Sequence, residues 1–597
     1  MGGPIMEDSK SNGFAPQEYG SDVIVDTLHG LGIDYIAMNP GATFRGIHDS
    51  IVNHLGNQQP ELILCNHEVI AVSLAQGYGR AAGKPMAAFV HDIVGLLNGS
   101  MAIFDAWMGR SGVLVLGATG PVDTNHRRPW IDWIHTANVQ GEVVRNFVKW
   151  DDQPASIEAS VESLIRGYNL VTSEPLGPVY ICFDADVQEQ KLDNPYKLPD
   201  FSQYPKPTRF QADPSALEEV AGLLIAAENP VVLANFLGRS DEAVQGLIQL
   251  AESLSIPVIN GGDFFNFPTR HPLYAADSKD TLLAEADVVL ALDVYDLQQD
   301  LTVVDRDTRT TKDILGPDTK LIDISLRQLL TKSWADDHGH LYPTEISVAA
   351  DTSLALPALA EIVQHKLDDE AVSLAKIVER NQRIKSLHET SLAKNQDIAK
   401  NQAGEHPLAL STITQELWEV VKEDDWVIGN GNLRGWVQKL WDIKHPYQDM
   451  RARGGGGLGE GLGHAIGVAL ANRDKGRLTI NIQSDGDMLF TPAALWTAVH
   501  HRIPLLIIMY NNRSYGNDLG HQGSMANVRS RPMERKTIGI DIDDPNVDFA
   551  ALARSFGAWA EGPIEKIEDL GPAIKRAKDE VMINGRVALV DVYTQTL

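Results

Sequence analysis

Asp485, Gly486 and Asn512 are the residues whose types and spacing most directly indicate chemistry. Asp485 follows the strand-like run RLTINIQS, Asn512 follows PLLIIMYN, and a helix-like stretch, TPAALWTAVHH, lies between them. Parallel strands present their carboxyl ends at one edge of a sheet, so both side chains should emerge there side by side. A carboxylate and an amide oxygen suit Mg²⁺, which leaves coordination positions for phosphate oxygens and water. Gly486 has no side chain, so a bound group can come close to the backbone there. The N-terminus of the helix that follows offers free N–H groups to an anion. The pattern predicts a Mg²⁺-diphosphate site.

Glu68 is a second candidate in a distant part of the chain. It follows the strand-like run ELILC and precedes VIAVSLAQGYGRAAGKP, a helical pattern of small residues expected over 69–82. An acid at the start of a helix is favoured by the helix dipole alone. A catalytic carboxylate is the other interpretation, and the residue types alone leave both open.

Three blocks of alternating strand and helix patterns must position these residues. Their strand-like runs are DYIAM, ELILC, PMAAFV, GVLVLGAT and VYICFD in the first block; PVVLAN, IPVIN, DVVLALDV and TKLIDIS in the second; and DWVIGN, RLTINIQ, PLLIIMY and VALVDVY in the third. Such alternation is typical of mostly parallel sheets covered by helices. We expect an α/β protein with three doubly wound domains in series, at 18–190, 205–365 and 400–597, after a disordered tail, 1–17.

Composition narrows the classes of partner and compartment. The net charge of -29 argues against nucleic acid and anionic membrane, because both need a basic protein face. The only cysteines, Cys65 and Cys182, sit in apolar runs and are expected to be buried thiols, which fits a cytoplasmic protein. No secretory signal pattern and no run of about 18 apolar residues is present, so no membrane span is expected.

The Asp485–Asn512 unit resembles the thiamine-diphosphate motif, Gly-Asp-Gly followed at a distance by Asn-Asn, with Ser484 in place of the first glycine. The resemblance implies that Asp485 and Asn512 bind Mg²⁺ through their side chains and Ser514 through its backbone carbonyl. Asp487 stands where a small residue faces the diphosphate, and we assign it no phosphate contact. The preceding run GGGGLGEGLGHAIG resembles the glycine-rich turn of acetolactate-synthase-like enzymes, in which Leu458 would support the bent cofactor.

Glu68 and the helix after it resemble the activating glutamate of the same enzymes. There the glutamate contacts the aminopyrimidine ring and promotes removal of the thiazolium C2 proton by the cofactor itself. In this family the glutamate and the metal site meet across a subunit interface. The resemblance therefore implies a homodimer or homotetramer.

The resemblance extends over nearly the whole chain and fits the acetolactate synthase, benzoylformate decarboxylase and pyruvate decarboxylase superfamily, whose order is pyrimidine-binding, central and diphosphate-binding domain. It implies a decarboxylase or carboligase acting on 2-oxo acids. The alternative is a lyase of the same chemistry, such as a 2-hydroxyacyl-CoA lyase or cyclic dione hydrolase. The central domain of relatives can hold FAD or ADP. In this chain, the Gly261-Gly262 pair of the central domain is not a fingerprint of FAD binding.

Several residues are candidates for the substrate pocket. His91 follows the activating glutamate at the same distance as a histidine of benzoylformate decarboxylase, where it would donate or accept a proton during the reaction. Ala42, in Asn-Pro-Gly-Ala, replaces the serine of that enzyme and removes a hydrogen bond to the substrate carboxylate. Gln140 corresponds to a glutamine near the thiazolium. The remaining pocket candidates are Asp92, His135, Tyr515 and His521.

Overall fold

The computed structural model describes residues 15–596, apart from 262–263, 306, 331–340 and 370–373. The predicted disordered tail, residues 1–17, and Gly262 of the central Gly-Gly pair therefore lie largely or wholly outside the described residues. The chain forms two compact units. The first runs to Pro207, except for Arg80–Gly83 and Ser173–Pro175, which belong with Thr208 and all later residues to the second.

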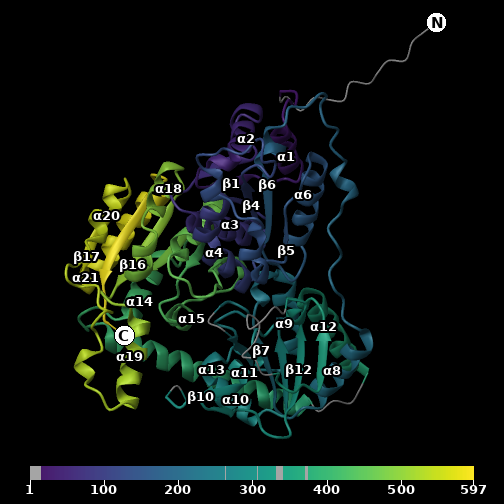
Figure 1. Ribbon diagram of the computed structural model, residues 1–597. Helices are drawn as coiled ribbons and strands as arrows, with labels where there is room; N and C mark the ends of the chain where they lie inside the picture. The colour runs from purple at the N-terminus through teal and green to yellow at the C-terminus, as the bar shows by residue number, and fades with distance from the viewer. Residues whose placement is uncertain (1–14, 262–263, 306, 331–340, 370–373, 597) are drawn as a thin grey trace. The chain divides into compact units, whose positions relative to one another are not determined.

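The first unit is built on a six-stranded parallel sheet of order β2-β1-β3-β4-β6-β5. Figure 1 labels β1, β4, β5 and β6 of this sheet. Its strands are β1 (Tyr35–Met38), β2 (Glu61–Leu64), β3 (Ala87–Val90), β4 (Leu114–Thr119), β5 (Trp150–Asp152) and β6 (Val179–Asp184). Its helices are α1 (Gly20–Gly30), α2 (Arg45–Asp49), α3 (Glu68–Ala82), α4 (Asp92–Met108), α5 (Asp132–His135), α6 (Ile157–Val171) and α7 (Ala185–Glu189). The central strands β3, β4 and β6 are buried along their whole length, which explains their unbroken apolar runs.

The second unit contains two five-stranded parallel sheets, β13-β12-β9-β7-β8 and β14-β15-β16-β18-β17, and a short antiparallel pair. The first sheet has β7 (Pro230–Ala234), β8 (Val258–Asn260), β9 (Val288–Leu292), β12 (Lys320–Ser325) and β13 (Ile346–Ala349), and the pair is β10 (Thr302–Val304) with β11 (Thr311–Asp313). The last sheet has β14 (Trp426–Asn430), β15 (Leu478–Ser484), β16 (Leu505–Asn511), β17 (Trp559–Ile564) and β18 (Val587–Tyr593). One apolar cluster contains core residues of both large sheets.

The helices of the second unit follow the same alternation. They are α8 (Pro214–Ala226), α9 (Asp241–Leu254), α10 (Lys279–Glu285), α11 (Leu297–Leu301), α12 (Thr352–Asp369), α13 (Leu374–Gln402), α14 (Leu410–Val421), α15 (Trp436–Leu440), α16 (Glu460–Asn472), α17 (Asp485–Phe490), α18 (Ala494–His500), α19 (Gly516–Val528), α20 (Phe549–Ser555) and α21 (Ile567–Met582). The predicted fold class, three parallel α/β sheets in series, is confirmed. Among the described helices, none has the length and apolar composition to cross a bilayer.

The helix predicted between Asp485 and Asn512 differs from the observed one. Helical structure starts at Asp485 itself, as α17, and resumes as α18 after a break. Thr491, at the end of α17, has φ -136° and ψ 50°, outside the helical region. Pro492 follows, and its ring disfavours a helical conformation at the residue before it. Asp485 is therefore the first residue of a helix and not only the last residue of a turn.

Candidate active site

The carboxyl edge of the third sheet brings Asp485 and Asn512 together. β15 and β16 are parallel neighbours, and Ser484 pairs with Tyr510 at their ends. Asp485 follows directly after β15, and Asn512 directly after β16. The strand pattern predicted this placement, and the observed register confirms it. Both side chains are buried, 2% and 6% exposed, so any ligand they hold is shielded from bulk water.

The donors at this edge fit a hard cation. Asp485 Oδ1 accepts the backbone N–H of Gly486 at 2.9 Å, whereas its Oδ2 is buried and has no hydrogen-bond donor. Burial raises the pKa of Asp485, and the backbone N–H groups of Gly486, Arg513 and Ser514 around the carboxylate oppose this effect. Asn512 Oδ1 accepts the N–H of Ser514 at 2.9 Å and keeps a second lone pair. A cation would satisfy the unpaired carboxylate oxygen, which otherwise carries a desolvation cost.

Asp487 has a position that the sequence did not reveal. Its Oδ1 accepts the backbone N–H of Gly459 at 2.5 Å, and its Oδ2 accepts Gln483 Nε2 at 2.5 Å. Burial raises the pKa of Asp487, and these two donors oppose the rise. The carboxylate therefore ties the glycine-rich turn to the end of β15. Both oxygens of Asp487 are thus engaged by groups of the protein.

Other predicted site residues precede or follow this edge in the chain, and they have different surroundings. Leu458 precedes α16 and its side chain is 42% exposed, so it is free to contact a ligand. A Cβ on Gly486 would come within 2.7 Å of the Tyr515 ring. Glycine is therefore needed at this position because the aromatic ring of Tyr515 packs directly against its backbone. The segment after Asn512 forms α19, which begins at Gly516 and carries the exposed His521.

In the first unit, Glu68 is the first residue of α3 and its side chain is buried. Asn39 Nδ2 donates to its Oε1 at 3.0 Å, and Asn98 Nδ2 donates to its Oε2 at 3.3 Å. A Cβ on Gly95 would lie 3.1 Å from Oε1, so this glycine leaves space beside the carboxylate. Two amides from different segments thus hold the orientation of Glu68. Neither Asn39 nor Asn98 was predicted to contact it.

His91 lies close to Glu68, since the Cβ position of Gly95 is also 3.3 Å from His91 Cβ. His91 Nδ1 is 2.9 Å from Thr43 Oγ1, and its Nε2 is 3.3 Å from His135 Nδ1. Burial lowers the pKa of His91 to about 4, so its imidazole is neutral near pH 7. The backbone of Gly41 is so close to the His91 ring that a Cβ there would collide with it.

Asp92 completes a cluster with the two histidines. Its side chain is fully buried, and its backbone has φ +33°, a left-handed value that is strained for aspartate. Burial raises the pKa of Asp92 to about 6. Asp92 Oδ2 lies 3.3 Å from His91 Nε2 and 3.6 Å from His135 Nδ1. The structure thus brings three predicted site residues into one group.

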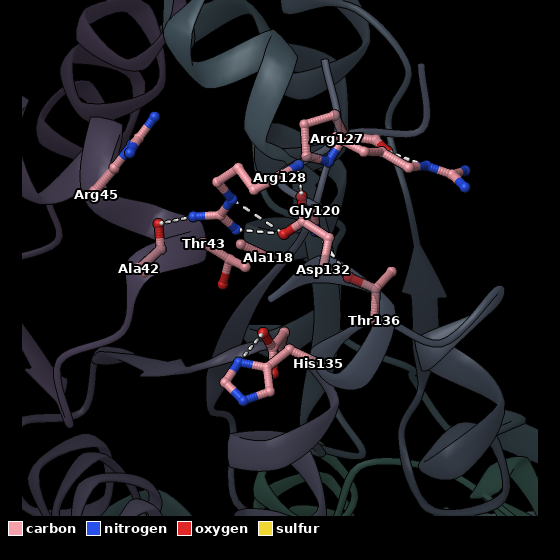
Figure 2. Close-up of polar contacts among 12 residues, drawn as sticks. Ala42, Thr43, Arg45, Ala118, Gly120, Arg127, Arg128, Asp132, His135 and Thr136 are labelled. Atoms are coloured by element: carbon pink, nitrogen blue, oxygen red, sulfur yellow. Dashed lines mark hydrogen bonds and ion pairs between the residues drawn. The ribbon is translucent and has the colours of Figure 1, made fainter. Parts of the chain in front are cut away.

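Arg128 and Asp132 form a buried ion pair beside Ala42, as Figure 2 shows. Arg128 Nη2 and Nε lie 2.6 Å and 3.0 Å from Asp132 Oδ1, and Nη1 donates to the Ala42 carbonyl at 3.4 Å. Ala42 is exposed, while Gln140 is fully buried and donates to the Ala118 carbonyl at 3.2 Å. The sequence analysis did not predict the pairing of Arg128 with Asp132.

Comparison with known proteins agrees with this geometry. Residues 19–144 match the family model "Thiamine pyrophosphate enzyme, N-terminal TPP binding domain", and residues 429–592 match "Thiamine pyrophosphate enzyme, C-terminal TPP binding domain". All of the predicted site residues fall within these two ranges.

Curated relatives align over most of the chain. Acetolactate synthase of Bacillus subtilis is 22% identical over 551 residues, which cover 90% of this chain and 87% of that protein. Benzoylformate decarboxylase of Pseudomonas aeruginosa is 26% identical over 549 residues, which cover 90% and 92%. In fold, the thiamine diphosphate-dependent 4-hydroxybenzoylformate decarboxylase of Rhodococcus jostii RHA1 superposes with a TM-score of 0.73 at 21% identity, covering 97% of this chain and 99% of that one. The chain therefore belongs to the thiamine pyrophosphate enzymes, with both their N- and C-terminal domains, and is a distant homologue of acetolactate synthase and benzoylformate decarboxylase.

Proposed function

We propose that this protein is a thiamine-diphosphate- and Mg²⁺-dependent decarboxylase or carboligase of 2-oxo acids. The observation that carries the proposal is the buried Glu68 carboxylate, which two amides orient at the start of α3 within the N-terminal TPP binding domain. A buried carboxylate is costly unless it has partners, and the space left by Gly95 gives this one access to a ligand.

Each residue would have a defined task. Asp485 and Asn512, through their side chains, and Ser514, through its carbonyl, would bind the Mg²⁺ that neutralises the diphosphate. Glu68 would share a proton with the pyrimidine ring nitrogen and so set the tautomer of the ring. When bound, thiamine diphosphate supplies a carbon nucleophile for a carbonyl group and a sink for the electrons released by bond cleavage. Leu458 would pack against the cofactor, and Gln140 would lie near its thiazolium end.

His91 would exchange a proton with the reacting substrate. It is a neutral imidazole beside Glu68, and Thr43 fixes the orientation of its ring. A neutral imidazole accepts a proton at one nitrogen and donates from the other, which suits both protonation and deprotonation steps. Asp92 and His135 surround its Nε2, and Tyr515 and His521 would belong to the cofactor and substrate surroundings in the second unit.

A lyase acting on a neutral dicarbonyl or 2-hydroxyacyl compound is a second candidate, and one observation favours it. Ala42 has no hydroxyl to bind a substrate carboxylate, and the cation beside it, Arg128, is engaged by the buried Asp132. A substrate carboxylate would have to compete with Asp132 for that guanidinium. A neutral carbonyl compound would not need it.

Release of CO₂ from a panel of 2-oxo acids separates the two functions. The enzyme, loaded with thiamine diphosphate and Mg²⁺, would be incubated with pyruvate, 2-oxobutyrate and benzoylformate, and in parallel with cyclohexane-1,2-dione. Release of CO₂ by the wild type but not by a Glu68→Gln variant would support the decarboxylase or carboligase. Consumption of the dione with no CO₂ from any acid would support the lyase. Failure of the protein to bind thiamine diphosphate would contradict both.

A further inference from the structure

Three possible metal ligands converge at the start of α4. His91 Nε2 lies 3.3 Å from His135 Nδ1 and 3.3 Å from Asp92 Oδ2, and His135 Nδ1 lies 3.6 Å from Asp92 Oδ2. All three atoms fall within 4.8 Å of one another. Two imidazole nitrogens and one carboxylate oxygen are a common ligand set for divalent zinc and other transition metals.

The spacing of these atoms matches one coordination geometry. Zinc binds histidine nitrogen and carboxylate oxygen at about 2.0–2.2 Å, so two ligands of a tetrahedral site lie roughly 3.3–3.5 Å apart. The three observed separations, 3.3, 3.3 and 3.6 Å, form nearly that triangle. Octahedral ligands at similar bond lengths would lie closer together, at about 3.0 Å.

Asp92 gives an independent indication of a missing positive charge. Its side chain is fully buried, and although Oδ1 accepts the Val94 N–H at 3.0 Å, Oδ2 has no hydrogen-bond donor. One proton on His91 Nε2 can point along only one line, either to His135 Nδ1 or to Asp92 Oδ2, which are both 3.3 Å away. A cation in the centre of the triangle would satisfy all three atoms at once.

Thr43 and Gly41 allow the His91 ring to take the orientation that metal binding needs. Thr43 Oγ1 lies 2.9 Å from His91 Nδ1 and can accept a proton from that nitrogen. In this tautomer the lone pair is on Nε2, which faces the other two ligands. Ligand histidines commonly use their second nitrogen in this way to fix ring and tautomer. Gly41 leaves room for the ring, because a Cβ at that position would collide with it.

We propose that His91, Asp92 and His135 bind a divalent transition-metal cation such as Zn²⁺, at a site distinct from the one proposed for Mg²⁺ at Asp485 and Asn512. Three protein ligands leave the fourth tetrahedral position open for water or a substrate oxygen, as in catalytic zinc sites. The proposal does not depend on the identity of the reaction. With the cation bound, His91 Nε2 could not carry a proton, and a metal-bound water would take over the acid-base role proposed for His91.

The test uses Co²⁺ as a spectroscopic probe, since tetrahedral Co²⁺ absorbs strongly in the visible region. Full-length protein is stripped with a chelator, saturated with Mg²⁺ and thiamine diphosphate, and titrated with Co²⁺, and bound metal is counted by mass spectrometry. We expect one Co²⁺ per chain with a tetrahedral band, displaced by Zn²⁺. Asp92→Asn and His135→Gln should abolish the band at stoichiometric Co²⁺.

Two further variants distinguish loss of the metal site from other reasons for a change in the Co²⁺ band. Thr43→Val keeps all three ligands and should weaken Co²⁺ binding about 10–100-fold, as loss of a second hydrogen bond to a ligand histidine does elsewhere. This variant keeps the test valid if a ligand substitution impairs folding. His126→Gln is the matched control, because His126 pairs with Asp186 at 3.0 Å on the exposed surface of the same unit, and it should leave the band unchanged.

Asp485→Asn should keep the Co²⁺ band even if it no longer binds thiamine diphosphate. Failure of the proposed function can therefore be distinguished from failure of the metal-site proposal. No tetrahedral band in the wild type would overturn the metal site. A band that survives in Asp92→Asn and His135→Gln would overturn it as well. In either case the two imidazoles form an ordinary hydrogen-bonded pair.

Discussion

Among single residues, Asp485 has the clearest need for a cation. It is buried at the end of β15, one of its oxygens has no hydrogen-bond donor, and burial raises its pKa. Asp485→Asn removes the charge while keeping the shape, so the cation would lose its one anionic protein ligand. We expect at least about a tenfold loss of Mg²⁺-dependent affinity for thiamine diphosphate, which is roughly 1.4 kcal/mol.

Isothermal titration calorimetry at several Mg²⁺ concentrations measures this loss. Asp518→Asn is the matched control, because Asp518 is an exposed aspartate in the first turn of α19 and should have no effect. Equal affinities of wild type and Asp485→Asn would contradict the assignment of Asp485 to the metal.

The positions of Asp485 and Asn512 could be predicted because both follow apolar strands, and neighbouring parallel strands end at one edge. The residues around Glu68 and His91 could not. Asn39 and Asn98 reach Glu68 across 29 and 30 residues of sequence, and Thr43 reaches His91 across 48. Such contacts depend on how loops cross the sheet edge, and no local pattern encodes them.

At the scale of elements, the turn before α16 depends on Gly459. This residue has φ +96°, and a Cβ there would lie 2.9 Å from Phe490 Cβ. Gly459→Ala should therefore destabilise the fold by roughly 1–3 kcal/mol and displace the N–H that Asp487 accepts. Chemical denaturation measures the change. Gly476→Ala is the matched control, with φ +67° but open space, and should cost less. Equal costs would mean that the contact with Phe490 does not matter.

Between the two sheets of the second unit, Asp449 is a buried anchor. It pairs with Arg451 and accepts the backbone N–H of Phe265 at 2.8 Å. Burial works to raise the pKa of Asp449, but the charge and hydrogen bond of Arg451, the charge of Arg80 and the backbone N–H of Phe265 together lower the pKa below its ordinary value. Asp449→Asn would leave a buried guanidinium without its carboxylate, at a cost of about 3–5 kcal/mol near pH 7.

The pH dependence follows from the lowered pKa. The stabilisation by Asp449 is fully present above the ordinary aspartate pKa, about 3.9, and is lost as the pH falls through the lower folded-state value. Denaturation midpoints of wild type and Asp449→Asn should therefore differ at pH 7 and converge only in strong acid. The exposed Asp474→Asn serves as control. A constant difference down to pH 2 would contradict this account.

The strands absent from the sequence prediction share a physical property. β5, β13 and β17 each lie at an edge of a sheet, and most of their residues are partly buried or exposed. An edge strand needs no unbroken apolar run, so its sequence resembles a loop. The short antiparallel pair, β10 and β11, is largely exposed and was missed for the same reason. Interior strands such as β3 and β16 were recognisable because both of their faces are buried.

At the scale of the whole molecule, we propose a homodimer or homotetramer in which Glu68 of one subunit serves the metal site of another. Glu68→Gln and Asp485→Asn would each be inactive alone. A mixed dimer contains one Glu68→Gln subunit and one Asp485→Asn subunit. If active sites are shared between subunits, one of its two sites then carries both substitutions and the other carries neither. Dissociating and reassociating an equal mixture should therefore restore about a quarter of wild-type activity. No recovery, with mixed dimers verified by native mass spectrometry, would indicate sites within one chain.

The central claim is that Glu68 activates bound thiamine diphosphate, and exchange of the cofactor's C2 proton for deuterium tests it most directly. The exchange is measured by acid quench and NMR without any substrate, so it does not depend on knowing the reaction. The control is Glu142→Gln, a variant of a glutamate whose side chain is 67% exposed. We expect Glu68→Gln to bind the cofactor but to slow C2 exchange by roughly 10²–10⁴-fold, while Glu142→Gln exchanges like the wild type. Exchange in Glu68→Gln as fast as in the wild type would contradict the claim.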